Sequence, residues 1–182
     1  MALWILLGIA VLLALYFISI YNSLVSYRVE VDNSWSQIDV QLKRRHDLIP
    51  NLVETVKGVM QFEKDTLTQV MQARSAAMGA ANPSDRIKAE NDITSGLGRL
   101  MAVWENYPTL KSNVNASQLQ EELTSTENKI AYVRGHYNDV VANLNAQVQQ
   151  FPSNLVAGAF GVQPREFLKA AETDKEVPQV KL

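Results

Sequence analysis

Apolar residues recur at alternating spacings of three and four along most of this chain, and this pattern limits the possible folds more than any other feature. In the longest run, ten consecutive positions keep the spacing and eight are apolar or aromatic: Leu119, Leu123, Thr126, Ile130, Val133, Tyr137, Val140, Leu144, Gln147 and Phe151. Residues spaced in this way lie on one face of an α-helix. We therefore predict an all-α protein whose long helices pack through these faces as an elongated antiparallel bundle.

Two further runs divide the predicted bundle into three long helices. The first helix extends from about residue 22 to residue 79, and the second occupies residues 82–107. The seam positions are Trp35, Ile38, Leu42, Arg45, Ile49, Leu52, Val56 and Val59 in the first run, and Ile93, Leu97, Leu100, Trp104 and Tyr107 in the second. Short connectors between such seams are typical of antiparallel neighbours.

Residues at the ends of these runs predict where helices begin. Asn82–Pro83 is typical of a helix start, with Asn as N-cap and Pro at the first helical position. The third helix should begin at Asn115 or Ser117, and Ser117 with Gln120 has the form of a capping box. One or two short helices should follow it, one of them beginning at Gln163–Pro164.

Residues 3–21, LWILLGIAVLLALYFISIY, contain no charged side chain. As a helix they would span about 28 Å, close to the thickness of the hydrocarbon core of a bilayer. A cleaved signal peptide needs a basic start, a shorter apolar core and a small-residue cleavage site, and these features are missing. We therefore expect an uncleaved transmembrane anchor over residues 1–22, a helical bundle domain over 23–170 and a disordered tail over 171–182.

The composition argues against several classes of function. The chain has no cysteine, so it has no disulfide, Cys-based metal site or Cys nucleophile. Its net charge of −2 does not suit the neutralisation of nucleic-acid phosphates, and it has no nucleophile motif or phosphate-binding loop. His46 and His136 are the only histidines and lack the spacing of a zinc site. We expect no catalytic residue, cofactor or metal; an enzyme would need both histidines and carboxylates to converge.

The block LKRRHDLIPNLV, residues 42–53, places a basic cluster beside a proline within the first helix. Pro50 cannot donate the helical hydrogen bond to the carbonyl of residue 46. We favour a continuous helix with a kink at about residues 46–50, because the seam keeps its phase from Leu42 to Val56. The alternative is a local break with Asp47 as N-cap.

Arg44 and Arg45 lie about 100° apart around a helix, so they cannot face the same way. Arg45 shares the apolar seam and needs a partner if it is buried. We expect Arg44 or Arg45 to form an interhelical salt bridge with Glu127, which lies next to the seam position Thr126 of the third helix. The alternative is a basic contact to lipid headgroups or to an acidic partner.

The segment SNLVAGAFGV, residues 153–162, is uncharged and rich in small residues. It either caps the bundle or contacts another protomer or the membrane surface. The sequence does not decide between these two interpretations.

Five blocks of the chain resemble the LemA family of bacterial membrane-anchored helical proteins: YNSLV (21–25), WSQIDVQLKRRHDLIPNLVETVKG (35–58), YPTLKSN (107–113), LQEELTSTENKIAYVRGHYND (119–139) and FPSNLVA (151–157). The resemblance implies an N-terminal transmembrane helix in the bacterial inner membrane and a long-helix bundle, and it does not imply a catalytic activity. Some members of the family are associated with building internal membrane compartments, and the genes of others lie beside membrane protease genes. The structural or partner-contact candidates are Arg44, Arg45, Asp47, Pro50, Glu127 and Arg134.

From these features we expect a single-pass, non-enzymatic scaffold or assembly protein that self-associates and organises membrane complexes or membrane shape. Its partners would be the lipid bilayer, further copies of itself, and a membrane protein such as a protease or a compartment-organising protein. Arg28 follows the span closely and favours a cytoplasmic bundle, although Glu30 and Asp32 offset its charge. The alternative is an accessory binding module that presents substrates to, or regulates, a membrane protease or signalling partner.

Overall fold

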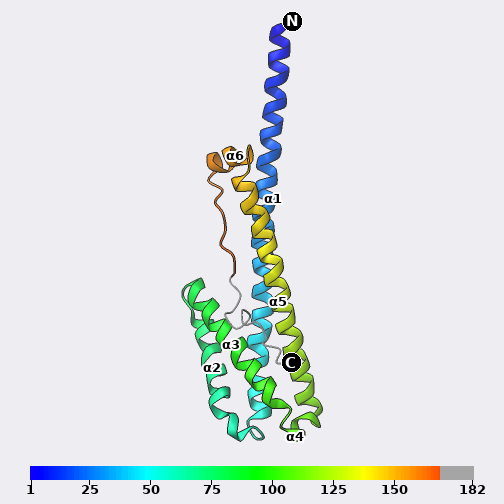
Figure 1. The fold of residues 1–182 in the computed structure, drawn as a ribbon, viewed down its shortest axis with the longest axis vertical. Coiled ribbons are helices and arrows are strands. Elements are labelled where there is room, and N and C mark those ends of the chain that lie inside the picture. The colour runs from blue at the N-terminus through cyan, green and yellow to red at the C-terminus, as the bar shows by residue number, and fades with distance from the viewer. Residues whose placement is uncertain (169–182) are drawn as a thin grey trace, which may run out of the picture. The chain divides into compact units, whose positions relative to one another are not determined.

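The computed structural model describes residues 1–168, and these residues are helical apart from short connections and an extended segment at the end. The long helices are α1 (Ala2–Val56), α2 (Lys64–Gly79), α3 (Pro83–Trp104) and α5 (Val114–Gln149), and the short ones are η1 (Gln61–Glu63), α4 (Pro108–Lys111) and α6 (Ser153–Phe160) (Figure 1). The prediction of an all-α fold that begins with a long apolar helix is confirmed. The tail predicted over 171–182 lies outside the described residues.

Contacts along the described chain group it into two compact units. The first unit comprises residues 1–38 and 132–168, and the second comprises residues 39–131. Both α1 and α5 contribute one part to each unit. The basic block of residues 42–53 belongs entirely to the second unit.

The core of the second unit is built from the predicted seams. Its buried members are Ile49, Leu52, Val56, Met60, Leu67, Val70, Ala77, Ala89, Ile93, Leu97, Leu100, Trp104, Leu110, Ala116 and Leu123. Helices α2 and α3 lie side by side in this unit (Figure 1). They approach closely at Gly96, where an added Cβ would lie 2.5 Å from Cγ2 of Val70. A residue with a side chain would therefore force the two helices or Val70 to shift.

The prediction of a nearly continuous helix from residue 22 to residue 79 is wrong, because the chain turns between Val56 and Lys64. Residues 57–59 form a turn that includes Gly58, a poor helix former. The N–H of Met60 donates to the carbonyl of Val56 at 2.8 Å, and the Met60 side chain is fully buried. The first predicted helix is therefore two helices, and α2 buries a face of its own through Leu67 and Val70.

The starts of α3 and α5 test the predicted caps. Asn82 caps α3 as predicted, since its Oδ1 accepts a hydrogen bond from the N–H of Asp85 at 2.9 Å. Helix α5 begins earlier than predicted, and its first turn is capped by Asn113, whose Oδ1 accepts from two backbone N–H groups at 3.0 and 3.2 Å. The predicted capping box at Ser117 is wrong because that residue already lies inside α5.

The first unit packs α1 against α5 and α6. Its apolar cluster consists of Leu24, Val156 and Ala157, with Ile20, Val148 and Val162 packed against it. The rings of Trp35 and Tyr137 make an edge-to-face contact with centroids 5.5 Å apart. The seam of α5 is buried from Val133 to Leu144, whereas Phe151 is 80 % exposed because α5 ends before it.

The helix predicted to begin at Gln163–Pro164 is absent over residues 163–168, and the chain after α6 follows an extended course (Figure 1). Asn145 pairs with the N–H and carbonyl of Arg165 at 2.8 and 2.9 Å, and Asn138 pairs with those of Leu168 at 2.9 and 3.0 Å. The two asparagines are about 10.5 Å apart along α5. Residues 165 and 168 are about 10 Å apart in an extended chain, and this match of lengths explains why the segment is not helical.

The first part of α1 contributes little to either core. Its apolar side chains from Leu3 to Ile18 are exposed, Trp4 by 76 % and Leu12 by 67 %. Among the described residues, α1 is the one helix long and apolar enough to cross a membrane. The division into anchor, bundle and tail stays a prediction.

Candidate functional site

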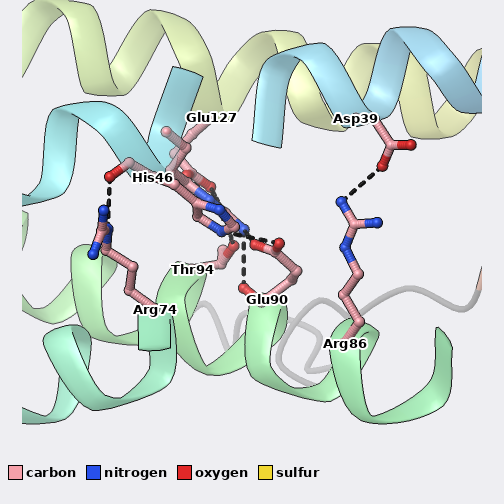
Figure 2. Close-up of polar contacts among 8 residues, drawn as sticks. Asp39, His46, Arg74, Arg86, Glu90, Thr94 and Glu127 are labelled. Carbon is pink, nitrogen blue, oxygen red and sulfur yellow. Dashed lines mark hydrogen bonds and ion pairs between the residues drawn. The ribbon is translucent and has the colours of Figure 1, made fainter. Parts of the chain in front are cut away.

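The candidate site is a buried ionic cluster in the second unit, formed by Arg45, His46, Glu90, Thr94 and Glu127 and called here the Arg45 cluster (Figure 2). These residues come from α1, α3 and α5. Arg45 is at its centre and is 1 % exposed. The arginine that the seam pattern predicted to face inward is therefore inside the protein.

The guanidinium of Arg45 donates hydrogen bonds in two directions. Its Nη1 donates to Thr94 Oγ1 at 2.7 Å and to the two carboxylate oxygens of Glu127 at 2.8 and 3.1 Å. Its Nη2 donates to the carbonyl of Glu90 at 3.2 Å and forms an ion pair with the carboxylate of the same residue. The Thr94 hydroxyl also donates to Glu127 at 3.2 Å. One planar fork of donors thus ties α1 to α3 and α5, a geometry that a lysine could not reproduce.

Glu90 is the deeply buried acid of the cluster, with 6 % of its surface exposed. Burial alone would raise the pKa of Glu90, but the contact with His46 and the positive charge of Arg45 outweigh it and hold this pKa below its ordinary value. The carboxylate is therefore ionised at neutral pH. Paired with Arg45, it avoids most of the free-energy penalty of an isolated buried charge.

His46 lies beside the same carboxylate, with its Nε2 3.0 Å from Oε1 of Glu90. Apart from this contact, neither atom has a hydrogen-bond partner among the described residues. Arg45 brings one positive charge against the two carboxylates of Glu90 and Glu127. A histidine beside a carboxylate is the chemistry of an acid–base pair, yet His46 and Glu90 are each less than 10 % exposed.

Pro50 leaves a backbone carbonyl near the cluster without its helical hydrogen-bond donor. Helix α1 is continuous through Pro50, as we favoured, and the alternative break with Asp47 as N-cap is wrong. Proline has no N–H for the carbonyl of His46. The structure supplies the missing donor from α2, because Nε of Arg74 donates to that carbonyl at 2.7 Å (Figure 2). The kink itself stays a prediction.

The two arginines of the block have different surroundings. Arg45 makes the interhelical pair with Glu127 that was expected of one of them. Arg44 instead lies 3.7 Å from Glu122, and about half of each of these side chains is exposed. Asp47 is also exposed and pairs with Lys43 on the same helix at 3.0 Å. These outer residues are placed where a partner could reach them.

The remaining candidates lie apart from the cluster in the chain. Arg134 belongs to the first unit and is half-buried on α5. His136 also belongs to the first unit and is exposed, whereas His46 belongs to the second. Within residues 1–168, no three His, Asp or Glu side chains are grouped closely enough to hold a metal ion.

Sequence reasoning missed Glu90, Thr94 and Arg74. A signal for Glu90 was present, since residue 90 lies three positions before Ile93 and therefore continues the seam of the second helix. A charged seam position on one helix facing a charged seam position on another is a reason to pair them. Arg86, one turn before Glu90, pairs with Asp39 of α1 at 2.7 Å (Figure 2), and nothing in the spacing pointed to that contact.

Comparison with known proteins places the chain in a family. A sequence profile of the LemA family matches residues 34–182. The chain belongs to the LemA family.

Protein LemA of Metamycoplasma hominis is 25 % identical, over 85 % of this chain and 71 % of that protein. Magnetosome protein MamQ 2 of Paramagnetospirillum magneticum is also 25 % identical, over 88 % of this chain and 70 % of that protein. Magnetosome protein MamQ of Magnetospirillum gryphiswaldense is 24 % identical over the same shares. The LemA match includes the whole Arg45 cluster.

Proposed function

We propose that this LemA family protein is a membrane-anchored, non-enzymatic scaffold that self-associates and organises membrane complexes or membrane shape. The observation that carries the proposal is that the side chains of the Arg45 cluster face the inside of the protein. Arg45 joins α1, α3 and α5 within one chain, and the side chains of Glu90 and His46 are buried. A cluster of this kind fixes the register of helices, which suits a scaffold better than a catalyst.

The relatives named as magnetosome proteins support the same proposal, because their names refer to an organelle and not to a reaction. The exposed apolar start of α1 supports a bilayer anchor. We place this single-pass anchor in the bacterial inner membrane and the helices that follow it in the cytoplasm, on the strength of Arg28 close behind the span. A C-terminal reporter that is active only in the cytoplasm tests the side: activity supports this orientation, and activity of a periplasmic reporter contradicts it.

Native-size analysis of the full chain in mild detergent tests self-association. The proposal predicts a particle that contains several copies of the chain after the detergent contribution is subtracted. A strictly monomeric particle without any co-purifying protein contradicts it. Variants of exposed charges, such as Arg44→Ala, should be compared with the unaltered chain. If copies contact one another through the outer face of the block, such a variant lowers the copy number without unfolding the core.

A groove between α2 and α3 favours a second candidate function, an accessory module that binds a partner such as a membrane protease or its substrate. The groove has a volume of about 430 Å³ and is lined mainly by polar side chains, among them Gln72, Asp92 and Arg99. Polar donors and acceptors of this kind suit the backbone of a peptide. Photocrosslinking from residue 72 in the native membrane distinguishes the candidates: this function predicts a different protein in the product, and the scaffold predicts a second copy of the chain.

A further inference from the structure

We propose that α6 is a second membrane contact, an interfacial helix that lies among the phospholipids at the point where α1 leaves the bilayer. This inference rests on the proposed anchor and concerns the segment of residues 153–162. It adds a lipid-binding surface to a chain whose first helix alone would otherwise hold it to the membrane.

The first observation is where α6 packs. It lies beside the part of α1 that ends the uncharged span of residues 3–21 (Figure 1). The ring of Phe160 packs against that of Tyr21, with centroids 4.5 Å apart and the ring planes tilted by 48°. Val156 and Ala157 bury Leu24 one turn further on. If residues 3–21 cross the bilayer, these contacts place α6 at the level of its surface.

The second observation is an apolar groove between the two helices. It has a volume of about 400 Å³ and is lined chiefly by Phe17, Ile18, Tyr21, Leu155, Val156 and Phe160. One wall of the groove thus belongs to the span itself. Since the surface of a spanning helix is covered by acyl chains, the same chains would fill a groove that is continuous with it.

The third observation is the outward face of α6. Leu155 is 56 % exposed and Phe160 is 63 % exposed, although both are large apolar side chains. No charged residue occurs between residues 140 and 164. Such a segment is costly to leave in water and suits the boundary between headgroups and acyl chains, where interfacial helices lie.

The charges nearby begin at the depth that this placement requires. Arg28 lies on the same face of α1 as Tyr21 and about 10 Å further along the helix. Arg28 and Arg165 line a second, smaller pocket of about 220 Å³, together with residues 161–164 that follow α6. This spacing puts the apolar groups at the acyl level. The headgroup layer is roughly 5–8 Å thick on each side, so the backbone of Arg28 lies just beyond it and the long side chain reaches back to the headgroups.

The absence of cysteine permits a direct test on the full chain, because a single introduced cysteine carries the only label. An environment-sensitive fluorophore is placed in separate variants at Leu155→Cys and Phe160→Cys. Leu12→Cys reports on the span, and Tyr132→Cys, at an exposed site on α5, is the matched control. Each protein is reconstituted in phosphatidylcholine vesicles with and without brominated acyl chains, and is also titrated with aqueous iodide.

The proposal predicts that brominated lipid quenches the labels at 155 and 160 to an extent comparable with the label at 12, while the label at 132 is quenched by iodide. Quenching of the labels at 155 and 160 by iodide alone, with the label at 12 quenched by lipid, overturns the interfacial helix and leaves the anchor intact. Protection from both quenchers overturns it in favour of a protein that covers α6. A label at 12 that lipid does not quench overturns the anchor and this inference together.

Discussion

Replacing Arg45 with methionine should destabilise the second unit far more than the same replacement of its neighbour, Arg44. Methionine leaves the carboxylates of Glu90 and Glu127 without the guanidinium that pairs with both. Removing one member of a buried ion pair costs about 3–5 kcal/mol, because the opposite charge stays buried without a partner. Arg44 lies 3.7 Å from Glu122 and both side chains are about half exposed, so Arg44→Met should cost about 0–1 kcal/mol.

Trp104 provides the assay, since it is 1 % exposed in the core of the second unit. The full chain carries Trp4→Phe and Trp35→Phe so that the remaining fluorescence comes from this core, and it is titrated with denaturant in detergent micelles. The midpoints and slopes give the free energy of unfolding. Losses that agree within about 0.5 kcal/mol for the two methionine variants would refute the reasoning, because surface substitutions are usually that mild.

A double variant sharpens the same prediction. Adding Glu90→Met to Arg45→Met removes the most deeply buried carboxylate together with its partner. Replacing buried ion pairs by apolar residues of similar volume is often neutral or stabilising, so the double variant should be more stable than Arg45→Met alone. A double variant that is less stable than Arg45→Met would show that the loss comes from packing and not from the unpaired charge.

Three further predictions concern the same unit. The pKa of Glu90 is held below its ordinary value of 4.5, so the contribution of Glu90 to stability is complete above pH 4.5 and is lost as the pH falls through the lower folded-state pKa. Denaturation midpoints measured between pH 7 and pH 3 should show this loss of stability, and Glu90→Gln should make the loss smaller. Arg74→Met should cost about 1–3 kcal/mol by leaving a backbone carbonyl without its donor, but less in a Pro50→Ala background, where alanine restores the helical N–H; additive losses in this double-mutant cycle would contradict the proposed role. Gly96→Ala should cost about 1–3 kcal/mol through overpacking. Gly98→Ala should be neutral or stabilising, because its added methyl group meets open space. Equal thermal melting temperatures for these two variants would contradict the close approach of α2 and α3.

Much of the fold could be predicted from periodicity, because burial follows the seams closely. Leu42, Arg45, Ile49, Leu52 and Val56 are all buried as their spacing predicted. The break before η1 was missed because the signal there was a single Gly58 in a run whose polar content was rising, and a helix can continue through one glycine. The burial of the Met60 side chain, which is a tertiary effect, favours the turn.

The ends of elements were harder to predict, because they depend on contacts with other parts of the chain. The asparagines at 138 and 145 give no local sign that they will hold a segment some twenty to thirty residues later. Pro164 was a reasonable helix start, and the extended segment prevails because both asparagines pair with it at once. Local propensity loses when tertiary hydrogen bonds match a different rise per residue.

The candidate site was half predicted for a related reason. The pairing of a buried arginine with Glu127 followed from one charged seam position and a neighbouring acid on another helix. Glu90 required the second helix to be extended by one turn and aligned with the first. The role of Arg74 depends on α2 folding back beside Pro50, and the expected continuous helix did not allow that.

The central claim, a membrane-anchored scaffold that self-associates, is tested most directly by counting copies in the membrane. The full chain, fused to a fluorescent protein, is extracted with its surrounding lipid into polymer-bounded discs, and photobleaching steps are counted in single discs. The account predicts several steps in most discs. A single step in nearly every disc, with a different protein present in equal amount, would contradict self-assembly and favour the accessory binding module.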